Sequence, residues 1–280
     1  MWVICGFVWD NTRTCVLLYP ATLCSVVAGI LAAEYECDIL TFEFIIEVME
    51  MNQERVLVVL AHPDDPEFFC GATLAKWARA GKEIYYLLLT CGDKGSDNPE
   101  MTPEALCGDR QMEQRAAAAV IGVKDVMFLA YRDGELANTL DVRREIVRVI
   151  RRLKPHIVIT SDPTTYIRAN TYINHTDHRT AGAATLDAVF PAAGNRMYFP
   201  ELLSEGLEPH SIKEVWLTLT LEPNLWVNVT HTLEIKLAAL RQHRSQIKDP
   251  DSLDKRIRER LRRSEFDDEL YAEGFRVIRF

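Results

Sequence analysis

Short apolar runs alternate with helix-like stretches four times between residues 55 and 189. Residues 55–61, 84–90, 125–130 and 157–160 are expected to be strands, and residues 67–80, 102–121, 139–153 and 178–189 helices. The first run is apolar throughout at residues 56–60, which is typical of a strand covered on both faces. Because crossover helices connect parallel strands, this order predicts a doubly wound, mostly parallel sheet with helices on both faces.

Further elements are expected after the alternating region. Strands are predicted at residues 214–219 and 225–229, and helices at residues 232–246 and 253–263. The expected fold class is therefore α/β, a Rossmann-like sheet with extra C-terminal strands and helices. No Gly-x-Gly-x-x-Gly or phosphate-loop pattern follows a predicted strand, so the sequence gives no support for nucleotide binding.

The charge of the chain is acidic and unevenly distributed. The formal net charge is −9, which argues against a nucleic-acid partner because phosphate backbones recruit basic surfaces. Residues 1–50 contain seven acidic residues and one base, Arg13, for a net −6, which leaves −3 for residues 51–280. The first fifty residues thus differ in composition from the rest of the chain.

Residues 1–50 are a leader for which three interpretations stay open. Residues 14–33 carry no charge and are about as long as a bilayer-spanning helix, so they could be a hydrophobic anchor. Against an anchor, Pro20 interrupts the run and only Arg13 could orient it. Met49 and Met51 stand just before the first strand, so the protein could start there, or the leader could be an extra packed element. We expect residues 51–280 to form a single domain and expect no membrane contact unless residues 14–33 are an anchor.

The cysteines are also unevenly distributed. Four lie in the first fifty residues, and the body contains Cys70, Cys91 and Cys107. The absence of a Cys-x-x-Cys pair argues against a thiolate zinc site. Three scattered cysteines predict reduced thiols in a cytoplasmic protein.

An imidazole and two adjacent carboxylates follow the first predicted strand. They are His62, Asp64 and Asp65, in the segment Ala-His-Pro-Asp-Asp-Pro-Glu. Ligands of parallel α/β sheets bind outside the carboxyl ends of the strands, so these side chains occupy a favourable position for chemistry. Taken alone, two acids before a helix are more often cap and dipole partners.

A second polar motif, Asn-His-Thr-Asp-His-Arg at residues 174–179, follows the fourth strand and opens a helix. Its histidines, His175 and His178, are three residues apart and can project the same way. Catalytic zinc takes three protein ligands and leaves one position open to water. His62, one of the two aspartates and one of the two histidines would complete such a set. The remaining carboxylate could then act as a general base, and the remaining histidine as a general acid or oxyanion stabiliser.

These motifs together resemble the LmbE/PIG-L family of zinc-dependent de-N-acetylases, which act on N-acetylglucosamine-containing substrates. The resemblance rests on Ala-His-Pro-Asp-Asp with Gly-Ala-Thr at residues 71–73, and on His-Thr-Asp-His downstream. It extends over most of residues 55–280 and includes residues 110–115, 133–136, 236–240 and 243–246. Residues 1–50 have no counterpart in it.

The resemblance implies one zinc ion per chain, bound by His62, Asp65 and His178. Asp64 would be the general base that takes a proton from the metal-bound water. Many members of the family place Glu directly after the aspartate pair, whereas this chain has Pro66 and then Glu67, which puts the role of that glutamate in doubt.

Four further residues receive roles from the resemblance. His175 would stabilise the oxyanion or protonate the leaving amine, and Asp177 would fix its orientation. Arg110 would lie near the substrate or acetate. Asp133 could contact a sugar hydroxyl or merely cap its loop. His243 is expected to serve packing or a subunit contact.

The predicted function is thus a zinc-dependent hydrolase that removes acetyl from the amide nitrogen of a small N-acetylated amino sugar or its conjugate. Two alternatives stay open: an amidase of the same mechanism on a non-sugar amide or thiol-sugar conjugate, and a catalytically silent sugar-binding protein. A homo-oligomer is compatible with the sequence.

Overall fold

The computed structural model describes residues 2–9, 13–20, 54–263 and 270–280, which fall in two compact units, Met1–Asn52 and Gln53–Phe280. In the first unit, β1 (Trp2–Trp9) and β2 (Arg13–Pro20) form an antiparallel pair. Residues 14–20 of the considered anchor are therefore in a strand, and residues 21–33 lie outside the described residues. Among the described residues, no helix combines the length and apolarity needed to cross a bilayer.

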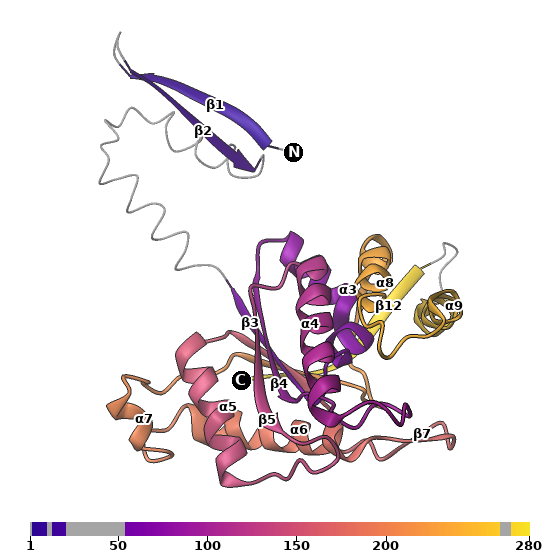
Figure 1. Cartoon of the computed structure of the whole chain (residues 1–280). Helices are drawn as coiled ribbons and strands as arrows, with labels where there is room; N and C mark the ends of the chain where they lie inside the picture. The colour runs from indigo at the N-terminus through magenta and orange to yellow at the C-terminus, as the bar shows by residue number, and fades with distance from the viewer. Residues whose placement is uncertain (1, 10–12, 21–53, 264–269) are drawn as a thin grey trace. The chain divides into compact units, whose positions relative to one another are not determined.

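The second unit is built on a sheet in which the five consecutive strands from β9 to the edge strand β5 are parallel (Figure 1). Two strands at one edge, β10 and β12, run antiparallel to their neighbours. Across the sheet the order is β10 (Leu225–Asn228), β12 (Leu270–Arg279), β9 (Glu214–Thr218), β6 (Ile157–Ser161), β3 (Arg55–Leu60), β4 (Glu83–Thr90) and β5 (Asp125–Tyr131). The short β11 (Arg262–Arg263) pairs with β12.

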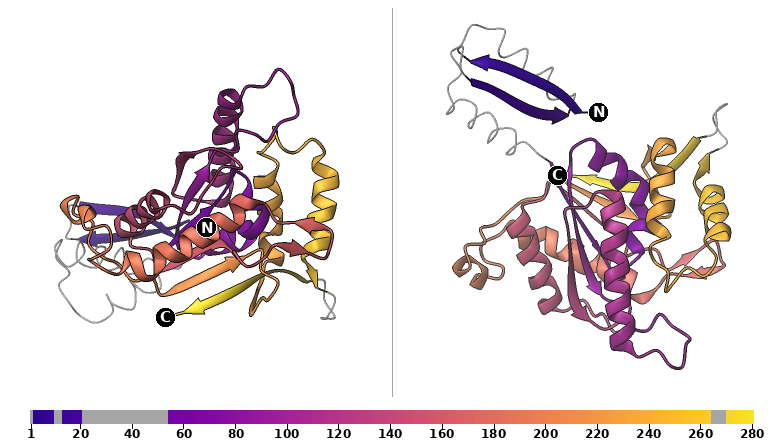
Figure 2. Two further views of the ribbon diagram at one scale, coloured as in Figure 1. Left: turned by 90° about the horizontal axis from the view of Figure 1, so that it is seen from below. Right: turned by 45° about the horizontal axis from the view of Figure 1, so that its top comes forward.

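Helices cover both faces of this sheet, as predicted (Figure 1, Figure 2). One face carries α3 (Asp65–Arg79), α4 (Pro103–Ile121) and α8 (Leu233–Leu240), and the other carries α5 (Leu140–Leu153) and α6 (Thr176–Asp187). The remaining helical segments are η1 (Ala188–Ala193), α7 (Glu201–Ser204), η2 (Thr230–Thr232) and α9 (Pro250–Leu261).

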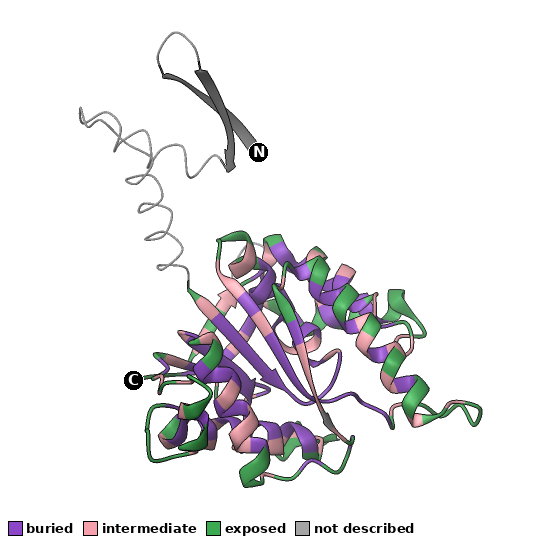
Figure 3. Cartoon of the chain, turned by 60° about the vertical axis from the view of Figure 1, so that its left-hand side comes forward, coloured by how far each residue is buried: buried purple, intermediate pink, exposed green. Residues whose placement is uncertain are grey.

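Strand β3 shows why the sheet needs cover on both sides. Val56, Val58 and Leu60 belong to the apolar core under α3 and α4, whereas Leu57 and Val59 belong to the core under α5 and α6. All five side chains are fully buried, and the central strands appear as buried in Figure 3. A continuous apolar run therefore fills two cores at once, which confirms the predicted α/β class.

Several boundaries differ from the prediction. The predicted loop between β6 and α6 contains a short hairpin, β7 (Ile167–Arg168) with β8 (Tyr172–Ile173). Helix α8 ends at Leu240 instead of residue 246. The largest difference is β12, which no pattern in the sequence analysis indicated.

A buried ion pair connects β12 to α8, and both of its members contact the backbone of α3. Lys236 Nζ lies 2.6 Å from Glu273 Oε1, and both side chains are essentially inaccessible, with exposures of 0% and 1%. Glu273 also accepts hydrogen bonds from the backbone N–H groups of Ala72 and Thr73, and Lys236 donates to the carbonyl of Phe68. Burial lowers the pKa of Lys236. The pair thus supplies hydrogen-bond partners to backbone groups of α3, the helix that begins at Asp65.

Replacing Glu273 with Gln should lower the free energy of unfolding by about 3–5 kcal/mol, because it leaves the buried ammonium of Lys236 without its counter-charge. Urea unfolding followed by circular dichroism measures this loss. The matched control is Glu222→Gln, which removes the exposed partner of Arg276 on the same strand and should cost less than about 1 kcal/mol. Equal losses for the two variants would contradict a special role of the buried pair.

Candidate metal centre and active site

The polar loops that were expected to converge do lie together at the carboxyl ends of the parallel strands. His62 follows β3, Asp133 follows β5, and His175 and His178 stand at the start of α6 after β6. All four line one cavity of about 320 Å³ together with Asp64 and Asp65. The predicted convergence of these loops at one edge of the sheet is therefore confirmed.

His62, Asp65 and His178 present ligand atoms to one another at distances that suit a metal ion. His62 Nδ1 lies 3.4 Å from Asp65 Oδ2, and His178 Nε2 lies 3.1 Å from Asp65 Oδ1. Neighbouring ligands around a tetrahedral zinc ion are roughly 3.3 Å apart, given bonds of about 2.0–2.1 Å. All three side chains are buried. The donor set and its spacing thus fit a divalent cation of the zinc type.

Second contacts hold the two imidazoles in place. His178 Nδ1 pairs with Asn174 Oδ1 at 3.0 Å, which leaves Nε2 for the metal. Burial tends to raise the pKa of Asp65, but His178 and His62 outweigh it and hold that pKa far below its usual range. Burial tends to lower the pKa of His62, but hydrogen bonds to three carboxylates raise it well above normal, so a metal must displace a proton there.

The carboxylate of Asp177 contacts Gly134 and His62. Its Oδ2 accepts a hydrogen bond from Gly134 N at 2.7 Å and lies 3.3 Å from His62 Nε2. The ring of His175 instead accepts a hydrogen bond from the backbone N–H of Asp177. Among the described contacts, the Asp177 carboxylate is therefore a partner of His62, a predicted metal ligand. The orienting role of Asp177 toward His175 stays a prediction, and the contact that supports it is the backbone N–H of Asp177. The spacing of residues in the sequence does not show which of two neighbouring histidines the Asp177 carboxylate contacts.

Replacing Asp177 with Asn should weaken metal affinity by roughly 10–100-fold, because the charged acceptor of His62 Nε2–H is lost. Competition with a chelator of known affinity measures the change. Asp187→Asn, at the exposed end of the same helix, is the control and should leave affinity unaltered. A normal metal affinity with a reduced kcat would contradict this assignment and favour a role through His175.

Asp64 has an unusual backbone and a perturbed carboxyl group. Its φ of 94° and ψ of −28° place it in the left-handed region, and it precedes the first residue of α3. Burial raises its pKa to about 6, even though Arg110 acts to lower it. At neutral pH Asp64 is still mostly ionised, so it can accept a proton.

Arg110 and Asp133 line the cavity, and the hydrogen bonds and ion pairs described for them are made to other residues of the protein. Arg110 donates to the carbonyls of Pro63 and Gly92 at 2.6 and 3.0 Å and lies 3.2 Å from Asp64 Oδ2. Asp133 Oδ1 lies 3.2 Å from His62 Nε2 and 3.7 Å from His175 Nε2. Both residues thus support the site, and their predicted contacts with substrate stay predictions.

Three aromatic residues at the cavity were missing from the predicted site. Phe68 and Phe69 come from the N-terminal part of α3, and Tyr172 comes from β8. Tyr172 is 49% exposed at the mouth. The only sequence signal for Tyr172 was its place three residues before His175.

The expectation of reduced cysteines is wrong for two of them. Cys91, directly after β4, forms a disulfide with Cys107 in α4, while Cys70 is a buried free thiol. The bond ties the loop after β4 to the helix that carries Arg110. Because disulfides are rare in reducing compartments of mesophiles, the cysteines no longer support the predicted cytoplasmic location, which stays a prediction.

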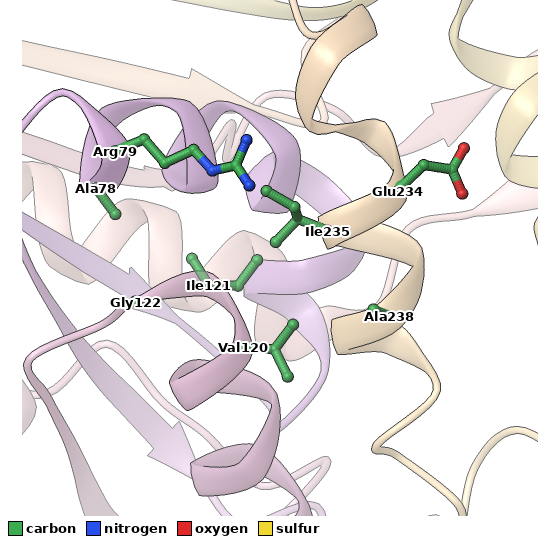
Figure 4. A pocket seen from close by; sticks show the side chains of 8 residues that line it. All are labelled: Ala78, Arg79, Val120, Ile121, Gly122, Glu234, Ile235 and Ala238. Atoms are coloured by element: carbon green, nitrogen blue, oxygen red, sulfur yellow. The ribbon is translucent and has the colours of Figure 1, made fainter. Parts of the chain in front are cut away.

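A second hollow of about 470 Å³ lies between α3, α4 and α8 (Figure 4). Its lining is apolar except for Arg79 and Glu234. None of the groups of described residues that could hold a metal includes a residue of this lining. Among the described residues, the groups that could hold a metal therefore lie at the smaller cavity.

The fold and the His–Asp centre define a class of metal-dependent α/β hydrolases. The profile of the PIG-L family, described as GlcNAc-PI de-N-acetylase, matches residues 57–189. The diacetylchitobiose deacetylase of Thermococcus kodakarensis is 38% identical over 193 residues, which cover 69% of this chain and 70% of the relative. The chain belongs to the PIG-L family.

Two further similarities agree with this family. A probable N-acetyl-alpha-D-glucosaminyl L-malate deacetylase 2 of Bacillus anthracis is 28% identical over 200 residues, covering 70% of this chain and 82% of the relative. The structure of the N,N'-diacetylchitobiose deacetylase from Pyrococcus horikoshii, complexed with its inhibitor, has a TM-score of 0.73 and 26% identity. It covers 97% of this chain and 95% of that one. The predicted family and the predicted reaction class, an N-deacetylase, are confirmed.

Proposed function

We propose that the protein is a zinc-dependent deacetylase of a small N-acetylated amino sugar, with His62, Asp65 and His178 as the metal ligands. The observation that carries this proposal is that the Asp65 carboxylate oxygens lie 3.4 Å from His62 Nδ1 and 3.1 Å from His178 Nε2, with all three side chains buried. Two imidazoles and one carboxylate are a donor set that zinc accepts in hydrolases. When bound, zinc lowers the pKa of water to about 7 and polarises the amide carbonyl.

The residues of the chain divide the remaining work. Asp64 is ionised at neutral pH and lies beside the ligand Asp65, so it accepts the proton of the attacking water. His175 lies across the cavity, with its ring centroid 4.7 Å from that of His62. Burial, together with the charge of His62, lowers the pKa of His175. The ring is therefore mostly neutral at neutral pH, and because its Nδ1 accepts the backbone N–H of Asp177, its proton lies on Nε2. An Nε2–H group suits a hydrogen bond that stabilises the oxyanion.

A sugar substrate agrees with the cavity and with the relatives. The cavity holds about 320 Å³, and Phe68, Phe69 and Tyr172 supply apolar surface next to carboxylates and imidazoles. Small-ligand sites commonly combine aromatic walls with a few fixed polar groups. The relatives described above are named for N-acetylated sugars and their conjugates. An amidase acting on a different small amide by the same mechanism is the competing candidate.

Acetate release from a panel of N-acetylated sugars and non-sugar acetamides tests the proposal. The full chain is stripped with a chelator, reloaded with zinc or another divalent ion, and assayed on each compound. Zinc-dependent release from amino sugars alone supports the proposal. Release from the non-sugar amides alone would favour the competing candidate, and no release by a metal-loaded protein would overturn the enzymatic function.

A further inference from the structure

The turn that presents Asp64 has to be held in place by its surroundings. A non-glycine residue in the left-handed region is strained by about 1–2 kcal/mol relative to ordinary backbone. Two side chains one turn apart on α4 hold this turn. Arg110 donates to the carbonyl of Pro63, and Gln114 Oε1 accepts the hydrogen bond of the Asp64 backbone N–H at 2.8 Å. The Gln114 contact is made to the strained residue itself.

Glu67 determines which way the Gln114 amide points. Gln114 Nε2 donates to both carboxylate oxygens of Glu67, at 3.1 and 3.0 Å, and both side chains are 0% exposed. An inverted amide would place its oxygen against the carboxylate and its NH2 group against the N–H of Asp64. Only the observed orientation satisfies both neighbours, so the carboxylate of Glu67 selects the acceptor that Asp64 needs.

His243 completes this buried chain. Its Nε2 lies 3.1 Å from Glu67 Oε2, and its ring is 0% exposed. Burial tends to lower the pKa of His243, but the hydrogen bond and the charge of Glu67 raise it above normal. None of Gln114, Glu67 and His243 lines the cavity of the metal centre. These three residues therefore act on the site only through the groups they hold.

We propose that Gln114 is a positioning residue for the deacetylation, fixing the left-handed backbone of Asp64, and that Glu67 and His243 orient its amide. This inference rests on the proposed function, in which Asp64 is the general base. It gives a role to the glutamate that follows Pro66. The chain of contacts runs from the segment after α8, through α3 and α4, to the base without touching a metal ligand side chain.

Gln114→Met keeps the volume of the side chain and removes its acceptor. With the zinc-loaded full chain, kcat should fall about tenfold to thirtyfold, which is the rate equivalent of one hydrogen bond and relaxed backbone strain. KM and the bound zinc should stay unchanged. The control is Gln111→Met on the same helix. The Gln111 amide donates a hydrogen bond to the sulfur of Cys107, and in this variant kcat should change less than about twofold.

A double-mutant cycle with Asp64→Asn separates positioning from general damage. If Gln114 acts through Asp64, Gln114→Met should cause no further loss of kcat in the Asp64→Asn background. The same fold loss in both backgrounds overturns the inference and leaves Asp64 as the base. Full activity of Asp64→Asn alone would overturn the proposed base, and this inference with it.

Glu67→Gln provides a second test that does not depend on Gln114→Met being folded. It keeps the size of the side chain but removes the charge that selects the amide orientation. We expect kcat to fall about threefold to tenfold at normal KM and normal zinc content. An unchanged kcat would show that the orientation of Gln114 does not matter and would overturn the inference.

Discussion

Replacing Asp64 with Asn should lower kcat by about 10²–10⁴-fold, because that is the usual contribution of a positioned general base. The amide is isosteric with the carboxylate but cannot take the proton of the attacking water. Metal content should stay at one ion per chain, since the ligand contacts are made by Asp65 and the two imidazoles. Steady-state kinetics combined with elemental analysis of the purified protein measures both quantities.

A control for this variant is available near the same site. Asp93→Asn changes a carboxylate that is also buried and pairs with Arg132 and Asp133 N, outside the groups that could hold the metal. It should lower kcat less than about tenfold. If Asp64→Asn retains more than a tenth of the activity at full metal content, Asp64 is not the base.

Replacing His178 with Ala should abolish both stable metal binding and activity. His178 supplies one of the three proposed ligands. The two remaining ligands cannot hold the ion against competition from water. We expect sub-stoichiometric metal after dialysis and a loss of kcat/KM of at least about 10³-fold, since the protein then lacks its activated water. Isothermal titration with zinc, followed by the acetate assay, provides the measurement.

His231→Ala is the matched control, because His231 is an exposed histidine outside the cavity and the metal groups. It should bind one zinc ion with unchanged affinity. A His178→Ala protein that still binds one zinc ion tightly and turns over substrate would contradict the proposed ligand set. Loss of activity with tight binding retained would instead point to His178 as a proton donor.

The sequence contained enough information to predict the sheet and the location of the site. Apolar runs predict strands covered on both faces, and polar residues at their carboxyl ends must meet at one edge of a parallel sheet. That reasoning brought together His62 and His178 across more than a hundred residues, and the structure agrees. Which carboxylate faces which imidazole was not predictable, because side-chain rotamers decide partners among groups a few ångströms apart. Asp177 is the example.

Strand β12 escaped prediction for a different physical reason. It contains Glu273 and Gly274, which are uncommon inside a strand with neighbours on both sides. The charge of Glu273 is acceptable only because Lys236, 37 residues earlier, is buried against it. A side chain at Gly274 would come within 2.7 Å of the Trp226 ring on β10. Both features depend on tertiary partners that no local pattern shows.

The position of β12 has a consequence for the order in which the protein can assemble. Although it is the last strand along the chain, it lies between β9 and β10, so the edge strand β10 cannot join the sheet before residues 270–279 are available. The same strand delivers Glu273 to α3, the helix that begins with a predicted metal ligand. During synthesis on the ribosome, the contacts of Glu273 with α3 can therefore form only after about a hundred further residues have followed His178, the last predicted ligand along the chain. Such non-local closure is entropically costly and slow.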